Sequence, residues 1–435
     1  MEVKRSTHSV VYPASPSPGG VIELSGIDQI AQRVYTSILF FYAGHAPVQE
    51  ASQLLNGSLS QALSLYYPLA GRFREKMNGE LEIVCNDEGA SFFEAWVECG
   101  FDRFLPGFEC SPEFNILGPP LDASADITSV PLLLAQITHF ECGHVCLGVR
   151  LHHQVCDGFS ASQFLSSWAR LARRSIEMAS DDGDSKVDVK VHHDRSLLRA
   201  NNPPSPTDEH PEYQTHKREL PTSRPPCVSK IFSFTPSSID DLRRKASSDV
   251  GPNHSRYEVL AAHLWRCIIR ARELDTEQEV RFGMPVDGRK RLDPPLPEGY
   301  FGNAIFYGYA SCKAGELAEN SLSFAADLVK TAIAKVDNAH MRSALDWIAS
   351  QETIKSIVPA YTPFIDFAMT SWWRFPFYEQ LDFGWGNPSH VRIPLFAFDG
   401  IVGLLPSAAG SGHVDALVGL QASQMPKFEE YMRKA

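Results

Sequence analysis

The residues of this sequence best suited to acid–base chemistry are two adjacent histidines, His152 and His153, and the aspartate Asp157 that follows them. They lie in the segment 152–158, which reads HHQVCDG. An imidazole titrates near neutral pH, so a histidine beside a substrate can take the proton from an attacking alcohol or amine. Such a histidine can equally be a hydrogen-bonded core residue, and its surroundings must decide between the two.

The elements around this segment predict how the histidines are presented. Apolar residues alternate from 145 to 151, as in a strand with one buried face, and the same alternation places His153 on that face and His152 on the other. From 161 to 172 apolar residues recur at helical spacing. We therefore expect His153 to point inward at a strand-to-helix turn, as a candidate general base.

The rest of the chain predicts two units that each combine helices with strands. A chain of 435 residues exceeds the size of roughly 250–300 residues at which a single core stops growing. We expect an N-terminal domain over 1–180, a proline-rich and partly acidic connector over 181–226, and a C-terminal domain over 227–435. Helices are expected near 53–67, 257–268 and 324–336, and strands near 81–84, 91–95, 131–137, 230–234, 280–284, 303–309 and 416–420. The predicted class is α/β.

Composition narrows the possible partners. The net charge of −12 argues against a nucleic-acid partner, which needs a basic face. No apolar run approaches the roughly 18 residues of a membrane span, and the first residues lack a secretory signal, so we expect a cytoplasmic protein without a membrane partner. The nine cysteines show no compact pairing pattern and are expected to be free thiols.

The strand before the histidines carries residue types that can bind zinc. Cys142, His144 and Cys146 share one strand face, and Cys156 follows in the motif. Their spacing lacks the separated ligand pairs of structural zinc sites, and cysteine is common in buried strands. We therefore expect no metal.

A second motif, DFGWG at 382–386, gives the chain a family resemblance. HHxxxDG alone also occurs in chloramphenicol acetyltransferase-like enzymes and in peptide-synthetase condensation domains. Both motifs, in this order and in a free-standing chain of this size, resemble the plant BAHD acyl-CoA-dependent acyltransferases. The stretches YPLAGR at 67–72, YFGN at 300–303 and TSW at 370–372 also match, and the opening 16–29 is most similar to the hydroxycinnamoyl-transferring branches.

The resemblance implies a fold and a reaction. It implies two chloramphenicol acetyltransferase-like domains, each a mixed sheet flanked by helices, with a reaction channel between them. An acyl-CoA co-substrate and a small alcohol or amine acceptor would meet in a ternary complex, with no acyl-enzyme and no permanently bound cofactor. The family also implies a monomer.

The resemblance assigns the chemical roles to three residues. His153 is the implied general base. Trp372 matches the tryptophan whose indole N–H can donate to the oxyanion that forms when a thioester is attacked. Thr370 matches a neighbouring hydroxyl that touches the acceptor or the intermediate. Core packing is the alternative for Trp372 and Thr370.

Other matching residues are implied to support the site rather than to react. Asp157 would pair with Arg289 of the second domain, and we expect Gly158 to allow the tight turn. The DFGWG motif would pack beside the CoA side of the channel, and its supporting residues are Asp382, Gly384, Trp385 and Gly386. Ser255 matches a position near CoA at the start of a helix, where a phosphate can bind, but a simple N-cap is an equal alternative.

The acceptor is the least determined part of the prediction. Shikimate and quinate transferases place an arginine a little over ten residues before the TSW stretch, whereas 356–369 contains no arginine or lysine here. A polyamine or an aliphatic alcohol is therefore favoured over shikimate or quinate, with Asp366 as a candidate to attract an amine, unless its carboxylate is solvated or caps a turn. The alternative functions are an inactive acyl-CoA-binding or partner-binding member of the fold and a carrier-dependent condensation-type enzyme.

Overall fold

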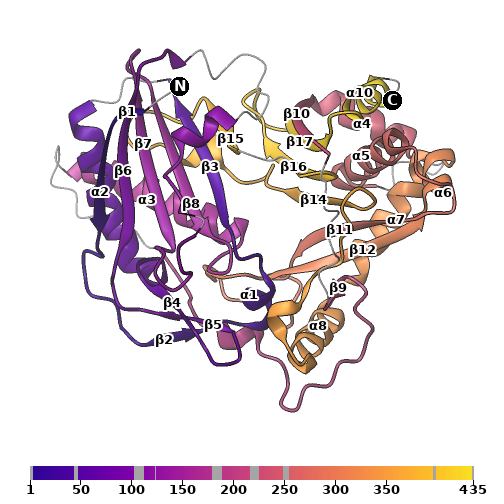
Figure 1. Cartoon of the computed structure of the whole chain (residues 1–435), viewed down its shortest axis with the longest axis horizontal. Helices are drawn as coiled ribbons and strands as arrows, with labels where there is room; N and C mark the ends of the chain where they lie inside the picture. Colours follow the sequence, from indigo (N-terminus) through magenta and orange to yellow (C-terminus); the bar gives the residue numbers. More distant parts are fainter. Residues whose placement is uncertain are drawn as a thin grey trace.

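Two six-stranded mixed sheets, each with its own hydrophobic core, form the framework of the protein (Figure 1). The computed structural model describes residues 3–43, 48–101, 112–122, 124–178, 189–215, 225–247, 254–394 and 398–433. In spatial order the first sheet contains β1 (Val3–Val11), β6 (Ala90–Val97), β7 (Leu133–Phe140), β8 (Val145–His152), β3 (Tyr35–Tyr42) and β15 (His390–Arg392). The second contains β10 (Cys227–Phe234), β17 (Val414–Gln421), β16 (Ile401–Pro406), β14 (Phe367–Ser371), β11 (Glu279–Asp287) and β12 (Ile305–Lys313). The predicted class, mixed sheets flanked by helices, is confirmed.

Both sheets mix parallel and antiparallel pairs. In the first sheet β6 and β7 run parallel, and in the second β14 runs parallel to both β11 and β16. The motif strand β8 lies between β7 and β3 and is antiparallel to each of them. The strand that ends at the histidines is therefore a central one, and all of its residues are buried.

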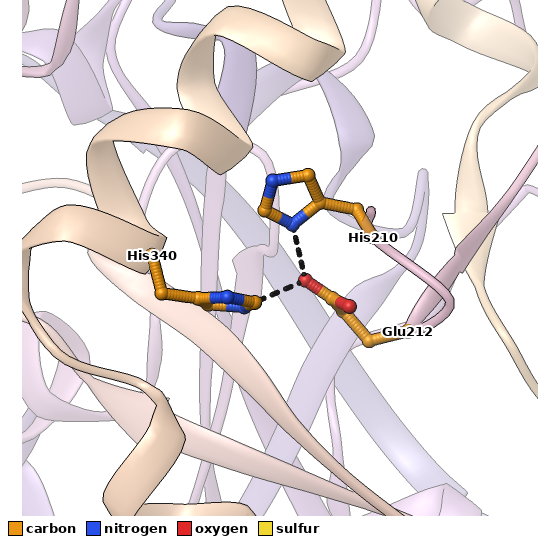
Figure 2. Close-up of side chains that lie close together, drawn as sticks. All are labelled: His210, Glu212 and His340. Carbon is orange, nitrogen blue, oxygen red and sulfur yellow. Dashed lines mark hydrogen bonds and ion pairs between the residues drawn. The ribbon is translucent and has the colours of Figure 1, made fainter. Parts of the chain in front are cut away.

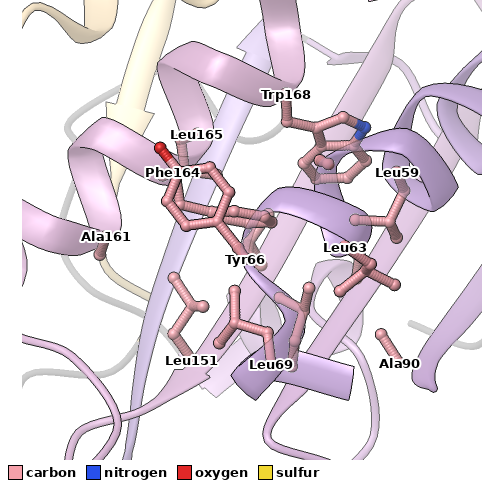
Figure 3. Close-up of a cluster of buried hydrophobic side chains, with 14 of the residues drawn as sticks. Leu59, Leu63, Tyr66, Leu69, Ala90, Leu151, Ala161, Phe164, Leu165 and Trp168 are labelled. Carbon is pink, nitrogen blue, oxygen red and sulfur yellow. The ribbon is translucent and has the colours of Figure 1, made fainter. Parts of the chain in front are cut away.

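Helices α2 (Val48–Leu65) and α3 (Gly158–Met178) cover the first sheet (Figure 3). Both have apolar residues at helical spacing on the face toward the sheet. Leu59 and Leu63 of α2 meet Phe164 and Trp168 of α3 in one fully buried cluster. Burying each of these side chains contributes roughly 1.5–3 kcal/mol, which fixes α3, and with it the turn that carries the histidines, against the sheet.

The second sheet is covered in the same way by α5 (Arg256–Arg272) and α7 (Leu322–Lys335). Helices α4 (Pro236–Lys245), α6 (Ala314–Glu319) and α10 (Met425–Arg433) pack around α5. The buried Trp265 of α5 contacts Phe282 of β11, whose ring lies against Phe367 of β14. This core holds β14, the strand that leads into the TSW stretch.

Two connections tie the halves of the chain together. β15 comes from the second half of the sequence but pairs with β3 at the edge of the first sheet. The described part of the predicted connector, 189–215, bridges to Tyr300 through His192 and pairs β9 (Tyr213–Gln214) with β13 (Val358–Pro359) beside α8 (Asn338–Ser350). The domain boundaries stay predictions, and 179–188 and 216–224 lie outside the described residues.

The remaining elements are short. They are β2 (Val21–Glu23), α1 (Gly26–Ile30), β4 (Arg72–Glu75), β5 (Leu81–Val84), α9 (Phe377–Gln380) and the 3-10 helices η1 (Tyr67–Ala70), η3 (Pro112–Leu117), η4 (Arg195–Leu198) and η5 (Ile354–Ser356). Within the ranges the structure describes, no helix has the length and apolar character needed to cross a bilayer.

Candidate active site

The turn that carries the HHxxxDG motif is held on both sides of His153. β8 ends at His152 and α3 begins at Gly158. The main-chain N–H of His153 donates to the carbonyl of Val34 at 2.9 Å, and the carbonyl of His153 accepts from Nδ2 of Asn303 at 2.9 Å. One residue from each half of the chain therefore fixes the main chain at this histidine.

The two histidines of the motif have different environments. His152 is 2% exposed, and its ring packs edge-on against Tyr35 and Phe73. Burial, together with the nearby side chains of His153 and Arg33, lowers the pKa of His152 to about 3, so this ring is neutral at neutral pH. The ring of His153 is half-buried, and its Nδ1 is buried without a hydrogen-bond partner among the described residues. Nε2 of His153 is thus the ring nitrogen left to meet a substrate.

The carboxylate of Asp157 is occupied by a buried, bidentate ion pair with Arg289. The two N–O distances are 2.8 and 2.9 Å, and the main-chain N–H groups of Ser160 and Ala304 donate to the same carboxylate at 2.9 Å. Burial alone raises the pKa of Asp157, but Arg289 and these donors outweigh burial and hold the pKa below its usual value. The ion pair that the resemblance implied is present, and it leaves no dyad between Asp157 and the histidine.

Trp372 reaches the histidine turn from the second half of the chain. It directly follows β14, and its main-chain N–H donates to the carbonyl of Leu404 at 2.7 Å. A Cβ placed on Gly158 would lie 3.3 Å from Nε1 of Trp372 and 3.1 Å from the ring of Phe375. The indole nitrogen therefore lies against the first residue of α3, beside the turn that carries His153.

The role of Gly158 differs from the one expected. We expected this glycine to supply conformational freedom for a tight turn. Its φ is not in the left-handed region, and it forms the first residue of a regular helix. Its missing side chain instead leaves the space that the rings of Trp372 and Phe375 fill.

Thr370 lies on the same strand and faces away from the core of the second sheet. Phe367 and Met369 of β14 are buried in that core. Because side chains alternate along a strand, Thr370 points to the opposite side and is half-buried there. Its main chain pairs with Gly403 of β16. The structure thus places Thr370 two residues before Trp372, on the strand that leads toward the turn.

The DFGWG loop docks on the core of the first half. Asp382 accepts the main-chain N–H groups of Gly384 and Gly386 at 2.8 and 2.9 Å, and both glycines have positive φ angles, +110° and +94°. Phe383 is fully buried against Trp168 of α3 at a centroid distance of 5.1 Å. Trp385 stacks on Phe383 at 5.9 Å. All of these contacts are structural, which agrees with a supporting role for the motif.

Ser255 is the N-cap of α5. Its hydroxyl accepts the main-chain N–H of Glu258 at 3.3 Å, and the Glu258 carboxylate accepts the N–H of Ser255 at 2.7 Å. Of the two alternatives for Ser255, the structure displays the cap. The Glu258 carboxylate already faces the helix N-terminus, which disfavours a phosphate there, so a role of Ser255 in CoA binding stays a prediction.

Asp366 lies in a closed turn rather than on an open surface. The residue is 1% exposed, and its two carboxylate oxygens accept the main-chain N–H groups of Arg281 and Thr362 at 3.1 and 2.7 Å. Burial raises the pKa of Asp366. Of the alternatives for Asp366, the structure displays the carboxylate that caps a turn. It gives no support to a contact between Asp366 and an acceptor.

A cluster of potential metal ligands joins the described part of the connector to α8 (Figure 2). Across the described residues, one such cluster is found: His210, Glu212 and His340. One oxygen of Glu212 accepts from Nδ1 of His210 at 2.7 Å and from Nε2 of His340 at 2.9 Å. These spacings are those of hydrogen bonds, whereas two ligands on one zinc ion are separated by more than 3 Å.

The hydroxyl of Ser343 determines which ring nitrogen of His210 carries the proton. It accepts the main-chain N–H groups of Thr207 and Asp208, both at 2.9 Å, so both of its lone pairs are used. It must therefore donate to Nε2 of His210, also at 2.9 Å, which leaves the proton on Nδ1. A metal at Nδ1 would need the opposite tautomer, so the cluster fits a hydrogen-bonded link better than a metal centre.

The sequence did not identify three residues that hold the histidine turn. They are Asp28, Arg195 and Asn303, which are buried around it. The YFGN stretch was noted without a role for Asn303. The spacing of Ser25 and Asp28 is that of a capping box, which the structure contains at α1, and it was the available signal for Asp28.

Comparisons with known proteins agree with one another. A family model described as the Transferase family matches residues 1–435. Hydroxycinnamoyltransferase 2 of Oryza sativa subsp. japonica is 35% identical over 449 residues, and shikimate O-hydroxycinnamoyltransferase of Nicotiana tabacum is 35% identical over 444 residues, each alignment covering 99% of both chains. A hydroxycinnamoyl-CoA:5-hydroxyanthranilate N-hydroxycinnamoyltransferase of Avena sativa is 36% identical over 451 residues and 98% of both chains.

Solved structures share the fold. Vinorine synthase superposes with a TM-score of 0.74 at 24% identity, covering 97% of this chain and 96% of that one. F. graminearum TRI101, complexed with coenzyme A and deoxynivalenol, superposes with a TM-score of 0.72 at 17% identity, covering 95% of this chain and 98% of that one. Both likenesses extend over nearly the whole chain.

Proposed function

This chain belongs to the Transferase family, the BAHD acyl-CoA-dependent acyltransferases, and on that premise we propose that it transfers an aromatic, hydroxycinnamoyl-type acyl group from CoA to a small amine or alcohol. Relatives of about 35% identity over nearly the full length carry hydroxycinnamoyl transfer in their names, onto shikimate in one case and 5-hydroxyanthranilate in another. They support the acyl group proposed here and leave both O- and N-acylation open.

One observation carries the proposed chemistry: the turn of His153, from the first half, faces the indole of Trp372, from the second. Nε2 of His153 takes the proton of the acceptor as its oxygen or nitrogen attacks the thioester carbonyl. The Trp372 N–H donates to the oxyanion of the tetrahedral intermediate, with Thr370 nearby. The intermediate collapses, the carbon–sulfur bond breaks, and the CoA thiolate takes the proton from the His153 imidazolium.

Asp157 takes no proton in these reaction steps. Its carboxylate is bound by Arg289 and by two main-chain donors, and its pKa is lowered, so it stays ionised. We propose that it maintains the shape of the turn. The supporting roles of Gly158 and of the DFGWG loop follow in the same way from their packing against Trp372 and against α3.

The proposed class of acceptor rests on the absence of a cationic side chain from the stretch before TSW. No arginine or lysine lies in 356–369, so a polyamine or an aliphatic alcohol is favoured over shikimate or quinate. The buried Asp366 does not contribute to this preference, because its carboxylate is occupied by the main chain.

The test is thiol release from a panel of CoA thioesters crossed with acceptors. Coumaroyl, caffeoyl, feruloyl, benzoyl and acetyl thioesters are each combined with spermidine, a fatty alcohol, shikimate, quinate, 5-hydroxyanthranilate and no acceptor. Acceptor-dependent release from an aromatic thioester, abolished in His153→Ala, is expected. Silence across the panel despite saturable acyl-CoA binding would instead indicate a binding protein, and release only from a carrier-tethered donor would indicate a condensation enzyme.

We also propose that the protein is a cytoplasmic monomer. Size-exclusion chromatography with light scattering measures the mass, and a particle near the 48.3 kDa of one chain is expected.

A further inference from the structure

We propose that Asn303 is a positioning residue that sets the place of the His153 base through its main chain. This inference rests on the proposed function, in which His153 takes the proton of the acceptor. Asn303 comes from the second half of the chain and is 2% exposed. It touches the histidine at the carbonyl rather than at the ring, so it acts through position and not through proton transfer.

The amide of Asn303 has a single orientation in this site. Its Nδ2 donates to the carbonyl of His153 and to Oδ1 of Asp28, both at 2.9 Å. Its main-chain N–H donates to the same oxygen of Asp28 at 3.0 Å. Because both partners of the side chain accept hydrogen bonds only, the nitrogen and not the oxygen of the amide must face them. The carboxylate of Asp28 thus determines where the amide presents its second N–H to His153.

Asp28 is itself immobilised, and it serves a second donor to the same turn. Its other carboxylate oxygen accepts from the main chain and the hydroxyl of Ser25, at 3.0 and 2.7 Å, in the capping box of α1. Arg195 lies 3.5 Å from Oδ1 of Asp28 and donates to the carbonyl of Val155 at 2.8 Å. One buried carboxylate therefore orients both donors that hold the carbonyls of residues 153 and 155.

Close packing around the neighbouring Gly302 restricts the position of Asn303. A Cβ on Gly302, the residue before Asn303, would lie 1.1 Å from Nη1 of Arg195. The carbonyl of Gly302 accepts from Ser160 and Arg289, both at 2.9 Å, on the other side of the turn. The chain around Asn303 is therefore wedged between the two buried pairs, Asp28–Arg195 and Asp157–Arg289.

The expected consequence of losing the Asn303 amide is a displaced base. The carbonyl of His153 would lose its donor, and the peptide between residues 153 and 154 would be held only through its N–H, by the 3.3 Å hydrogen bond to Nδ1 of His152. A reacting group that is misplaced by about 1 Å can lose roughly 100-fold in rate. Substrate affinity depends on other contacts and is expected to change little.

The chain offers a matched control in Asn201. Like Asn303, it donates its main-chain N–H and its side-chain Nδ2 to one buried aspartate, here Asp346 of α8, both at 2.7 Å. Asn201→Ala and Asn303→Ala are compared by thermal unfolding, by kcat and KM for acyl-CoA, and by ring NMR of histidine-labelled protein. The His153 signal is assigned from its absence in His153→Ala.

Asn303→Ala is expected to lower kcat by about 10- to 100-fold with KM within about 3-fold, and to alter the pH titration of the His153 ring. Asn201→Ala is expected to change the melting temperature alone. If Asn303→Ala does not fold, Asn303→Ser takes its place, because serine is polar but carries no amide N–H for the His153 carbonyl.

The same experiment separates this inference from the function on which it rests. If His153→Ala is inactive while Asn303→Ala keeps the native kcat and the native His153 titration, the positioning role is wrong and the base stands. If His153→Ala keeps its activity, the general-base part of the proposed function is wrong, and the NMR comparison alone then decides whether Asn303 positions the histidine.

Discussion

At the scale of single residues, the two neighbouring histidines of the motif differ in burial and therefore in their suitability as a base. His152 sits between Tyr35 and Phe73, and its pKa falls to about 3, so it cannot act as an efficient base near neutral pH. His153 is half-buried and is anchored through its main chain. Alternation along the strand places the two rings on opposite faces, and only the packing shows that His152 is the more deeply buried of the two.

We expect His153→Ala to abolish acceptor-dependent thiol release, lowering kcat by about 100- to 10,000-fold, because the general base is lost. The measurement is a thiol assay at saturating substrates. His152→Ala is the matched control, and it should lower the melting temperature because it empties a buried site between two aromatic rings, while the folded fraction stays active. An active His153→Ala variant would rule out the base.

Trp372→Phe is expected to lower kcat by about 100- to 1,000-fold, because it removes one oxyanion donor and keeps an aromatic ring. Trp373→Phe is the control, since the neighbouring indole packs against the core of the second sheet. Steady-state kinetics of both variants provide the measurement. Equal kcat values for the two variants would contradict the oxyanion role of Trp372.

Asp157→Asn is expected to reduce the free energy of unfolding by about 3–5 kcal/mol, because it removes the buried counter-charge of Arg289 and leaves only the partly exposed Asp287 beside the guanidinium. The pKa of Asp157 is lowered in the folded state, so the pair stabilises the protein above the unfolded pKa near 4 and loses that stabilisation as the pH falls through the folded pKa. Urea unfolding against pH measures both effects. Full stability with no activity would mean that the carboxylate has a chemical role.

At the scale of elements, a hydrogen bond between two titratable side chains joins α8 to the described part of the connector, 189–215. His340 of α8 contacts Glu212 of the connector, and the negative charges of Asp208 and Asp337 also raise its pKa, while His210 packs beside it. The hydrogen bond to Glu212 is the largest cause of the raised pKa of His340. Such a group stabilises the fold most when it is protonated.

We therefore expect the stability from this link to be fully present below about pH 6.5, the unfolded pKa of a histidine, and to be lost as the pH rises through the higher folded pKa of His340. The pKa of Glu212 is lowered, so its contribution is lost only at acidic pH. Thermal unfolding from pH 5 to 9 tests this, with His340→Gln as the comparison. The idea fails if the variant loses stability by the same amount at every pH.

At the scale of the whole molecule, the second half of the sequence completes the first half of the structure. β15 extends the first sheet, and Phe383 of the DFGWG loop is buried against α3. Arg289 and Asn303 likewise cross over to hold the histidine turn. The candidate site is therefore built from both halves, and its integrity depends on their docking.

Phe383→Ala is expected to lower the free energy of unfolding by about 3–5 kcal/mol, because it leaves a cavity between the halves. Phe398→Ala, where the ring is 59% exposed, is the control. Denaturant unfolding monitored by fluorescence measures both. Equal stabilities would show that the DFGWG loop does not hold the halves together.

The sequence by itself determined the features that depend on short-range patterns. Alternation and helical spacing predicted β8, α3 and the turn between them, and the two motifs predicted the family and the Asp157–Arg289 pair. The strand β3 was missed because its residues from 38 to 42 are all apolar as well as buried, so no alternation marks it. Gly158 was recognised, but for its conformation rather than for the space that it leaves to Trp372.

Apart from the Asp157–Arg289 pair, which the family resemblance implied, the tertiary structure alone decided which distant residues meet. The contact of Trp372 with the turn of His153, the bonds from Asp28 to Asn303 and the occupation of Asp366 by main-chain donors join residues that local patterns treat as independent. Hydrogen bonds and packing act over a few ångströms in space, whatever the separation along the chain. A sequence pattern reports which face of an element is buried, and only the packing of the elements shows what lies against that face.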